Sequence, residues 1–530
     1  MTVNRYDAIV IGAGHNGLVT AAYLGRAGRK VLVLERREVV GGAAVTEQVF
    51  PGFKFDTAAH RIGGLHPSVI KDLALERHGL ELRRADPSVF APAKDGPPLV
   101  VWRDPQRTVE SLRAISPADA KAWIPFSELI GKAATVVQSA WSSTPPSMTG
   151  NDPRDLWAVL KLSAGLRRLG KKDMIEVVRI LSMSMSELLG DWFESDVVKG
   201  TLAASGVAGM MQGPMAAGTV YNFLHHHVGA ADGALRPTVR VRGGVGELTK
   251  ALAAAAAEAG AEIRTNQSVA RVTVKAGRAI GVVLSSGEEF VSNRIVSNAD
   301  PRSTFFDLVG PAELEPELVR KVKNIRFKGV SAKVHLALGE LPRFDGVPEG
   351  GPHLNGVISI GPSLEYLEQA YDDAKYGAPS RHPYLEVSIP SVLDPDLAGP
   401  GKHVMSVVVQ YVPYRLAEGE WGAAARERLG DAVLSTLSEY APGIESAVLH
   451  RQVLTPLDLE ETFGLPEGNS YHGEHTLDQL IFMRPVPGQA RYRTSIDGLY
   501  LCGAGTHPGG GVTGYPGYNA AREIVRDGKG

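Results

Sequence analysis

Residues 8–18 decide the fold, and they read Ala8-Ile9-Val10-Ile11-Gly12-Ala13-Gly14-His15-Asn16-Gly17-Leu18. The apolar run at the start of this stretch predicts a buried β-strand, and the pattern of Leu18–Ala27, which stops at Gly28, predicts a helix. A second apolar run, Lys30–Leu34, ends at Glu35. A strand, a glycine turn, a helix and a strand within about thirty residues make a βαβ unit, so we expect an α/β fold with a Rossmann-type domain.

The three glycines of this turn have different physical roles. Gly12 permits the tight turn, Gly14 lets the backbone approach a pyrophosphate, and Gly17 allows the helix to pack closely. The N–H groups and the dipole at the start of the helix favour the phosphates, and Glu35 is placed to bind the hydroxyls of a ribose. We therefore predict a dinucleotide site that includes the loop residues Gly12, Ala13, Gly14, His15, Asn16 and Gly17.

Two features bear on which dinucleotide is bound. Arg36 and Arg37 come next, where an arginine can bind the 2′-phosphate of NADP; the alternative is that one covers the adenine and the other is solvated. Gly41-Gly42-Ala43-Ala44-Val45-Thr46-Glu47 lies just beyond. A second glycine pair that exposes the backbone suits a cofactor that continues past the pyrophosphate, as FAD does. The sequence therefore predicts non-covalently bound FAD, with contacts from Glu35, Arg36, Gly41, Gly42 and Ala43.

A glycine-dense stretch near the C-terminus supports a flavin independently. It spans Gly503–Gly514, between a predicted strand at Gly498–Cys502 and a predicted helix at Asn519–Val525. Its N–H groups and the dipole of the helix would stabilise the negative charge that a reduced flavin carries.

The wide separation of these motifs predicts a discontinuous FAD-binding domain with an inserted α+β substrate domain. We assign 1–85, 236–305 and 490–530 to the FAD-binding domain, and 86–235 and 306–489 to the substrate domain, with its helical part at about 117–228. Helices are expected at Ile175–Leu189 and Met210–His227. Further strands are expected at Ala270–Leu284, Arg294–Ser297, Val330–Leu338, Leu385–Ile389 and His403–Tyr411.

Composition excludes several classes of protein. Lys and Arg total 56 and Asp and Glu total 58, so the net charge is 56 − 58 = −2 and bulk attraction to nucleic acid is not expected. A single cysteine, Cys502, excludes intrachain disulfides and two-thiol redox chemistry. We find neither a leader peptide nor an apolar stretch long enough to cross a membrane, so we expect a cytoplasmic protein. The basic segment Leu166–Lys172 permits at most a peripheral contact with a membrane. The sequence does not decide the oligomeric state, and a homodimer is one alternative.

Several stretches spread over the chain match one family: Gly12–Leu18, Gly41–Glu47, Pro51–Phe55, Arg242–Leu248, Ser297–Pro301 and Gly498–Ala521. In them the chain resembles the phytoene-desaturase-like branch of the FAD-dependent amine oxidase and desaturase superfamily. The resemblance implies that Val269 presents its backbone to the adenine. It also implies a flavin lined by Gly503, Gly505, Gly511 and Val512. Two positions depart from it: Ala43 stands where many members have Arg, and Pro237–Val241 lacks the expected aromatic residues.

The sequence offers candidates for the chemical step but no clear acid–base pair. His60 and Arg61 follow the glycine pair where the chain should return over the flavin, and Tyr515, with Tyr518, lies beside the C-terminal glycine loop. His225–His227 is a further candidate. His472 and His475 have a spacing that a metal can use, but no third ligand is in view, so we predict no metal. Each of these side chains has an ordinary structural alternative in the core or on the surface.

We expect an FAD-dependent oxidoreductase that transfers hydride between the flavin and a hydrophobic, polyene or lipid-like substrate, as a desaturase, saturase or isomerase. Such chemistry depends mainly on orienting the substrate, so it does not require a strong base. Oxygen, a quinone or another acceptor would reoxidise the flavin, because no second nucleotide-binding unit is present. The alternatives are an amine oxidase and a flavin-stabilised interaction protein with little turnover. Five methionines are candidates for an apolar channel or for ordinary core: Met183, Met185, Met210, Met211 and Met215.

Overall fold

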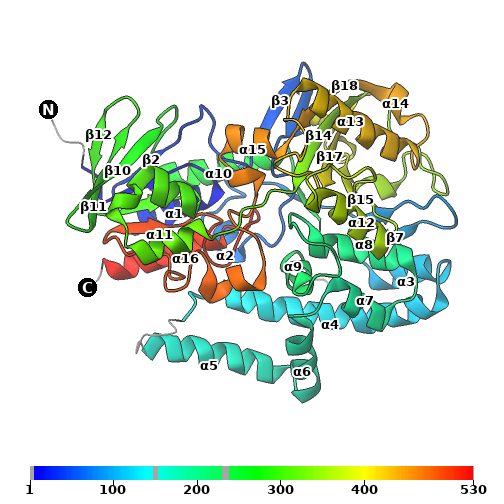
Figure 1. Ribbon diagram of the computed structural model, residues 1–530, viewed down its shortest axis with the longest axis horizontal. Coiled ribbons are helices and arrows are strands. Elements are labelled where there is room, and N and C mark those ends of the chain that lie inside the picture. The colour runs from blue at the N-terminus through cyan, green and yellow to red at the C-terminus, as the bar shows by residue number, and fades with distance from the viewer. Residues whose placement is uncertain (1–4, 147–152, 230–234, 236–237, 529–530) are drawn as a thin grey trace.

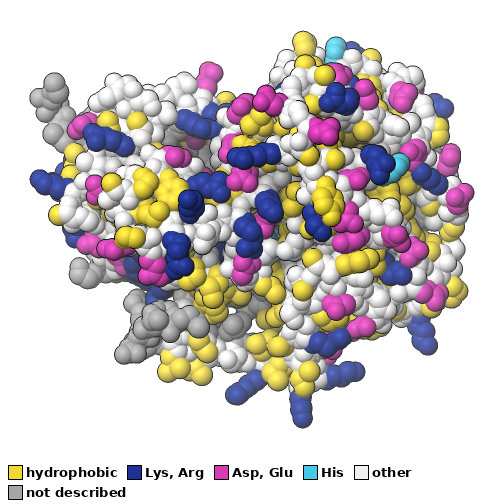
Figure 2. Space-filling model, viewed as in Figure 1, with side chains coloured by type: hydrophobic (Ala, Val, Ile, Leu, Met, Phe, Trp, Pro, Cys, Tyr) yellow, Lys and Arg dark blue, Asp and Glu magenta, His cyan; other side chains and the backbone are white. Residues whose placement is uncertain are grey.

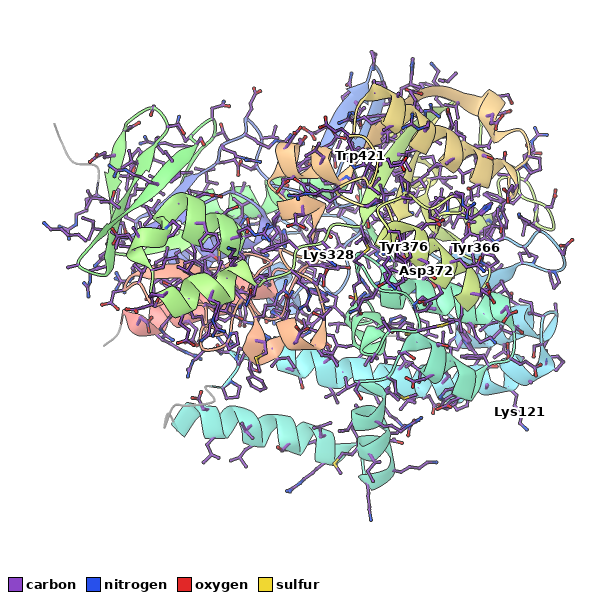
Figure 3. All side chains as sticks on the ribbon, in the orientation of Figure 1. Lys121, Lys328, Tyr366, Asp372, Tyr376 and Trp421 are labelled. Carbon is purple, nitrogen blue, oxygen red and sulfur yellow. The ribbon has the colours of Figure 1, made fainter. Side chains whose placement is uncertain are left out.

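The computed structural model describes residues 5–146, 153–229, 235 and 238–528. The chain forms two lobes that lie side by side, with a layer of helices below the second one in the view of Figure 1. One lobe is built on a five-stranded sheet and the other on a seven-stranded sheet. Lys328, labelled in Figure 3, lies where the chain passes between the two lobes, shortly before it enters the larger sheet.

The smaller of these sheets is parallel, and its strands come from three separate parts of the chain. In hydrogen-bonding order they are β19 (Leu499–Leu501), β13 (Ile295–Ser297), β1 (Ala8–Ile11), β2 (Val31–Leu34) and β9 (Glu262–Arg264). Parallel neighbours need crossover connections, which lets distant segments share one sheet. The predicted discontinuous Rossmann-type architecture is confirmed, whereas the domain boundaries stay a prediction.

Both faces of the parallel sheet are covered, which explains why its central strands are apolar at every position. Val10 points into a core shared with helices α1 (His15–Arg26), α10 (Val245–Glu258) and α16 (Tyr515–Asp527). Ile9 points into the opposite core. That side is covered by a three-stranded antiparallel sheet of β10 (Val269–Lys275), β11 (Arg278–Leu284) and β12 (Glu289–Val291).

The second lobe contains the mixed seven-stranded sheet. Its order is β18 (Val448–Leu454), β14 (Ser331–Leu338), β17 (His403–Gln410), β16 (Leu385–Ser388), β15 (Val357–Ile360), β6 (Val89–Ala91) and β7 (Leu99–Val101). Helix α13 (Ala423–Ser438) packs on one face through Leu429 and Val433. The strands predicted at Val330–Leu338, Leu385–Ile389 and His403–Tyr411 are confirmed.

Helices predominate between residues 117 and 228, as predicted, but two of the expected helices have different limits. The first is divided between α6 (Lys171–Ile180) and α7 (Met185–Trp192), because Ser184 and Glu187 form a capping box that starts a new helix. The second is largely irregular. It becomes helical only at α9 (Thr219–His225), because Pro214 and the left-handed Gly218 interrupt the pattern before it.

The remaining elements complete the two lobes and the helical layer. They are β3 (Thr46–Phe50), β4 (Phe53–Asp56), α2 (Pro67–Asp72), β5 (Leu82–Arg84), α3 (Pro105–Arg113), α4 (Pro117–Trp141), α5 (Pro153–Arg168), α8 (Asp196–Val207), β8 (Val239–Val241), α11 (Pro316–Lys323), α12 (Leu364–Lys375), α14 (Ile444–Ala447) and α15 (Pro456–Phe463).

The start of helix α2 holds a histidine that must be neutral to act as a cap. The Nδ1 atom of His66 accepts a hydrogen bond from the Ser68 N–H at 3.1 Å, so it caps the helix. The ring is buried against Tyr515 and Tyr518, each 4.3 Å away between ring centroids. Burial lowers the pKa of His66 to about 4, with a contribution from the charge of Arg522.

This histidine predicts a loss of stability in acid. Between its folded pKa of about 4 and its ordinary pKa of 6.5, the unfolded chain binds a proton that the folded chain does not. Stability therefore falls as pH drops through 6.5 towards 4, by about 2 kcal/mol at pH 5 from this group. We expect His66→Asn, which caps a helix without titrating, to reduce the fall in Tm between pH 7.5 and 5. An unchanged fall in Tm would show that His66 does not contribute.

Candidate functional site

A cavity of about 530 Å³ is lined by residues of both lobes. One end is formed by the loops at the carboxyl ends of the parallel strands, where ligands bind in folds of this kind. The other end is formed by β14, β16 and β17 of the seven-stranded sheet. Most of the predicted cofactor residues line this cavity: Gly12, Gly14, His15, Asn16, Glu35, Arg36, Gly41, Gly42, Ala43, Val269, Gly511 and Val512.

The N-terminal glycines have the geometry that their spacing predicts. Gly12 has a φ of +91°, which suits the tight turn after β1. A Cβ on Gly14 would lie 2.6 Å from the Asn298 Nδ2 atom, and Asn298 also lines the cavity. Gly17 does not line the cavity; a Cβ there would lie 2.2 Å from the Gly12 carbonyl oxygen, so this position allows close packing.

Glu35 is held at the cavity wall by backbone donors. Its Oε2 accepts a hydrogen bond from the Ala13 N–H at 2.8 Å, and its Oε1 accepts one from the Arg37 N–H at 2.9 Å. A carboxylate has lone pairs for about four hydrogen bonds, so capacity remains for ribose hydroxyls. The Arg37 side chain pairs with Glu47 at 2.7 Å, whereas Arg36 is exposed beside the cavity.

The second glycine pair is joined to the first. The Gly41 N–H donates to the Ala13 carbonyl oxygen at 2.8 Å, and a Cβ on Gly42 would lie 3.2 Å from the Gly14 Cα. The carbonyl oxygen of Ala43 accepts a hydrogen bond from the Ala59 N–H at 2.9 Å. This bond brings the chain that carries His60 and Arg61 back to the cavity.

The C-terminal glycine loop contributes two kinds of position. Gly511 and Val512 line the cavity together with Thr513. Gly503 and Gly505 do not line it. A Cβ on Gly503 would lie 2.6 Å from the Asn298 carbonyl oxygen, and one on Gly505 would lie 2.4 Å from Pro301 Cδ, so these two glycines allow loops to pack.

Polar atoms along the wall are matched to a polar ligand. His15 Nε2, His472 Nδ1 and Thr513 Oγ1 are buried without a hydrogen-bond partner among the described residues. Burial lowers the pKa of both histidines to about 4, so they are neutral near pH 7. Buried polar atoms normally find partners, and the ring, hydroxyl and phosphate groups of FAD supply them. The wall therefore fits FAD.

Gly14 gives a direct test of this fit. We expect Gly14→Ala to displace Asn298 into the cavity and to weaken FAD binding by about tenfold or more, measured as flavin retained after gel filtration and as Kd by fluorescence titration. Gly190→Ala is the matched control, because a Cβ there meets nothing within 4 Å. Equal FAD affinity in Gly14→Ala and the control would contradict the assignment of this wall to the cofactor.

The catalytic candidates His60 and Arg61 share one carboxylate. His60 Nε2 lies 3.1 Å from Glu386 Oε1, and an Arg61 nitrogen lies 3.6 Å from the same oxygen. Arg61 also reaches His226 Nδ1 at 3.4 Å, and His226 Nε2 lies 3.0 Å from the Tyr471 hydroxyl. Burial, followed by the charge of Lys333, lowers the pKa of His60 to about 4.

Lys333 and Glu386 also line the cavity, although neither was predicted from the sequence. Lys333 is 3% exposed, and its Nζ donates to the Asp56 carbonyl oxygen at 2.8 Å. Burial lowers the pKa of Lys333 to about 8. The sequence signal that could have found both residues is a charged side chain within an otherwise apolar strand, because Lys and Glu are almost never fully buried without a partner.

The other candidates are divided between the core and the cavity. Tyr515 is buried and accepts a hydrogen bond from Gln138 Nε2 at 3.3 Å, and Tyr518 packs edge-on against Tyr23; neither tyrosine lines the cavity. In the histidine triplet, His225 and His226 line the cavity. The Nδ1 atom of His227 lies 2.6 Å from the Phe223 carbonyl oxygen of helix α9, just after the end of that helix.

His472 and His475 lie in different surroundings. His472 lines the cavity, while His475 Nε2 accepts from the Gly510 N–H at 3.1 Å and its ring stacks on Tyr471. Within residues 5–146, 153–229, 235 and 238–528, no three His, Cys, Asp or Glu side chains are grouped as metal ligands would be.

The methionines do not form a channel to the cavity. Met185 and Met210 are buried in the core, Met183 and Met211 pack beside it, and Met215 is exposed. None of the five is among the residues that line the cavity.

The segment before Arg242 does not form the cavity wall either. Thr238–Val241 lies at strand β8, which pairs with β5, and Pro237 lies outside the described residues. The wall comes instead from the strands of the larger sheet. The aromatic residues that this segment lacks therefore do not bear on this cavity.

The basic segment Leu166–Lys172 lies at the junction of α5 and α6, at the lower edge of the molecule in Figure 1. Arg167, Arg168, Lys171 and Lys172 are exposed, and Figure 2 shows Lys and Arg side chains projecting at this edge. None of the described helices has the length and hydropathy that would let it cross a bilayer. Peripheral membrane contact, the cytoplasmic location and a homodimer stay predictions.

A buried arginine holds the loop that carries Tyr471 and His472 against the C-terminal glycine loop. Arg484 is 2% exposed, and its guanidinium donates to the carbonyl oxygens of Ala504, Gly473, Glu474, Gln479 and Tyr471. Five buried carbonyls therefore depend on one side chain. The fork of an arginine spans them, whereas the compact ammonium of a lysine cannot.

We expect Arg484→Lys to lower stability by on the order of 3–5 kcal/mol, because it leaves buried carbonyls without donors. Urea unfolding of the FAD-loaded protein measures the loss. Arg381→Lys is the control, since its side chain is 85% exposed. Similar midpoints for the two variants would show that the carbonyl contacts add little.

Known proteins match this chain over nearly its whole length. A family model described as flavin containing amine oxidoreductase matches residues 17–525. A rat protein named pyridine nucleotide-disulfide oxidoreductase domain-containing protein 2 is 40% identical over 99% of this chain and 94% of its own length. One subunit of the limonene dehydrogenase of Castellaniella defragrans is 30% identical, over 99% and 95%. A lycopene-forming phytoene desaturase of Pantoea ananas is 25% identical, over 95% and 96%.

The fold is also similar to that of solved structures. A triple mutant of putrescine oxidase superposes with a TM-score of 0.61 at 15% identity, covering 99% of this chain and 98% of that one. At such identity the likeness concerns the fold alone.

Proposed function

Because the chain belongs to the family of flavin-containing amine oxidoreductases, we propose that it oxidises or reduces a carbon–carbon bond of a largely hydrophobic substrate, as a desaturase, saturase or isomerase. The chain is an FAD-dependent oxidoreductase, and the predictions of an enzyme and of FAD are confirmed by this family. Bound FAD supplies a site that accepts or donates a hydride. The proposal concerns the bond that reacts and the class of substrate.

The observation that carries the proposal is the charge at the far end of the cavity. Two cations, Arg61 and Lys333, line it beside one carboxylate, Glu386, which is already paired with His60 and Arg61. A protonated amine placed there would be repelled by the two cations. A carbon–carbon bond carries no such penalty, and the surrounding side chains need only orient it.

The printed names of two relatives are compatible with this choice. One is a limonene dehydrogenase subunit and the other a phytoene desaturase, and both names denote oxidation of hydrocarbons. The rat relative at 40% identity has a name that refers to disulfides. A single, buried Cys502 gives this chain no pair of thiols for that chemistry.

An amine oxidase is the second candidate, and Glu386 is the observation that favours it. A carboxylate beside the cavity can bind an ammonium group, as the substrate of a putrescine oxidase would require. A flavin-stabilised interaction protein is the third candidate. The electron acceptor is part of the proposal: oxygen, a quinone or another soluble acceptor.

Anaerobic reduction of the FAD-loaded protein tests the proposal. We first expect a flavin absorption spectrum whose chromophore is released on unfolding, as non-covalent binding requires. Long-chain substrates with a carbon–carbon single bond to oxidise, or reduced enzyme mixed with polyenes, should then change the flavin spectrum, whereas alkylamines and diamines should not. Bleaching by amines alone would support the amine oxidase and overturn the proposal.

A further inference from the structure

Five charged side chains, three of them buried and two partly buried, gather where the larger sheet meets the loop that carries His60. They are the cations Arg61, Arg240 and Lys333 and the carboxylates Asp56 and Glu386. Three cations less two carboxylates leave one positive charge. The excess faces the cavity, because Arg61 and Lys333 line it and Arg240 does not.

Arg61 lies 3.6 Å from Glu386, whereas the hydrogen bonds of the other two cations go to main-chain oxygens. Lys333 donates to the main-chain oxygen of Asp56, and Arg240 donates to the main-chain oxygens of Asn355 and Gly356 at 3.4 and 3.1 Å. The Asp56 carboxylate instead accepts hydrogen bonds from Thr46 Oγ1 at 2.6 Å and from the Val245 N–H at 2.9 Å. Burial raises the pKa of Asp56.

An uncompensated buried charge is unfavourable, and an anion that enters the cavity removes this penalty. A guanidinium matches the planar, two-oxygen geometry of a carboxylate. The excess of one charge also corresponds to a carboxylate, since a phosphate monoester carries about −1.5 to −2 near pH 7.

The neighbouring wall is suited to an apolar chain. Trp141, Ala208, Val330 and Val408 line the same cavity. Gln410, which also lines it, has its amide committed to the protein: its Oε1 accepts from the Gly209 N–H and Ser331, and its Nε2 donates to Val207 and Met210. The Gln410 amide is therefore not free to bind a substrate, which leaves the charged side chains of Arg61 and Lys333 to anchor one.

We propose that Arg61 and Lys333 bind the carboxylate of an otherwise apolar substrate, such as a long-chain or polyene acid, so that the enzyme acts on amphipathic acids rather than on plain hydrocarbons. This inference rests on the proposed function, because it names the substrate class of the same cavity. The anchor fixes one end of the substrate, and the apolar wall directs its chain along the cavity.

Equilibrium binding to the oxidised holoenzyme tests the anchor without requiring turnover. Decanoate and decanol are titrated, and the perturbation of the flavin spectrum gives each Kd. We expect decanoate to bind at least about tenfold more tightly than decanol, a difference of about 1.4 kcal/mol. Arg61→Met and Lys333→Met should each reduce this preference by about tenfold, and Arg61→Lys should retain part of it.

Lys121→Met is the matched control. Lys121 is exposed on α4, and Figure 3 shows it at the outer edge of the molecule, away from the larger sheet. Flavin occupancy and Tm show whether each variant is folded. If Arg61→Met does not fold, Lys333→Met and Arg61→Lys carry the comparison.

Several results would overturn the anchor. They are a wild-type protein that binds decanol as well as decanoate or binds neither, one that prefers decyl phosphate, and variants that keep the preference for the acid. A lower flavin midpoint potential in Arg61→Met with unchanged decanoate affinity would show that the cations act on the reduced cofactor instead. Amine oxidation with an intact preference for decanoate would overturn the proposed reaction and leave the anchor standing.

Discussion

Backbone segments from opposite ends of the chain come into direct contact at the carboxyl edge of the parallel sheet, and this contact requires glycine. A Cβ on Gly517 would lie 2.3 Å from the Asn16 carbonyl oxygen, and one on Gly503 would lie 2.6 Å from that of Asn298. The N-terminal turn, the loop after β13 and the C-terminal loop therefore pack as one unit. The wall of the cofactor site depends on this close approach, because each loop supplies part of it.

The second lobe supplies what this wall lacks. The glycine loops offer N–H groups and the neutral His15, whereas β14 and β16 bring Lys333 and Glu386 to the other end of the cavity. Arg484 holds the Tyr471 loop between them through main-chain carbonyls. The parallel sheet thus supplies the dinucleotide end of the cavity, and the larger sheet supplies the charged side chains at the other end.

Local features of the chain could be predicted from the sequence better than features that depend on distant contacts. The glycine positions and the strands β10, β11, β14 and β17 were predicted well, because turn geometry and apolar patterns act over a few residues. The two helices with wrong limits depended on the capping box at Ser184 and on the left-handed Gly218. The methionines were an open alternative, and burial places Met185 and Met210 in the core.

The sequence by itself determined that this chain builds a parallel sheet with a dinucleotide site, because the spacing of Gly12, Gly14, Gly17 and Glu35 acts within one βαβ unit. Only the tertiary structure decided the character of the other end of the cavity. Arg61, Lys333 and Glu386 lie far apart in the chain, so no local pattern of the sequence shows that they come together. Their charges act on one another only because a loop of one lobe meets two strands of the other at the wall of the cavity, where burial of Lys333 and Glu386 weakens the screening by water.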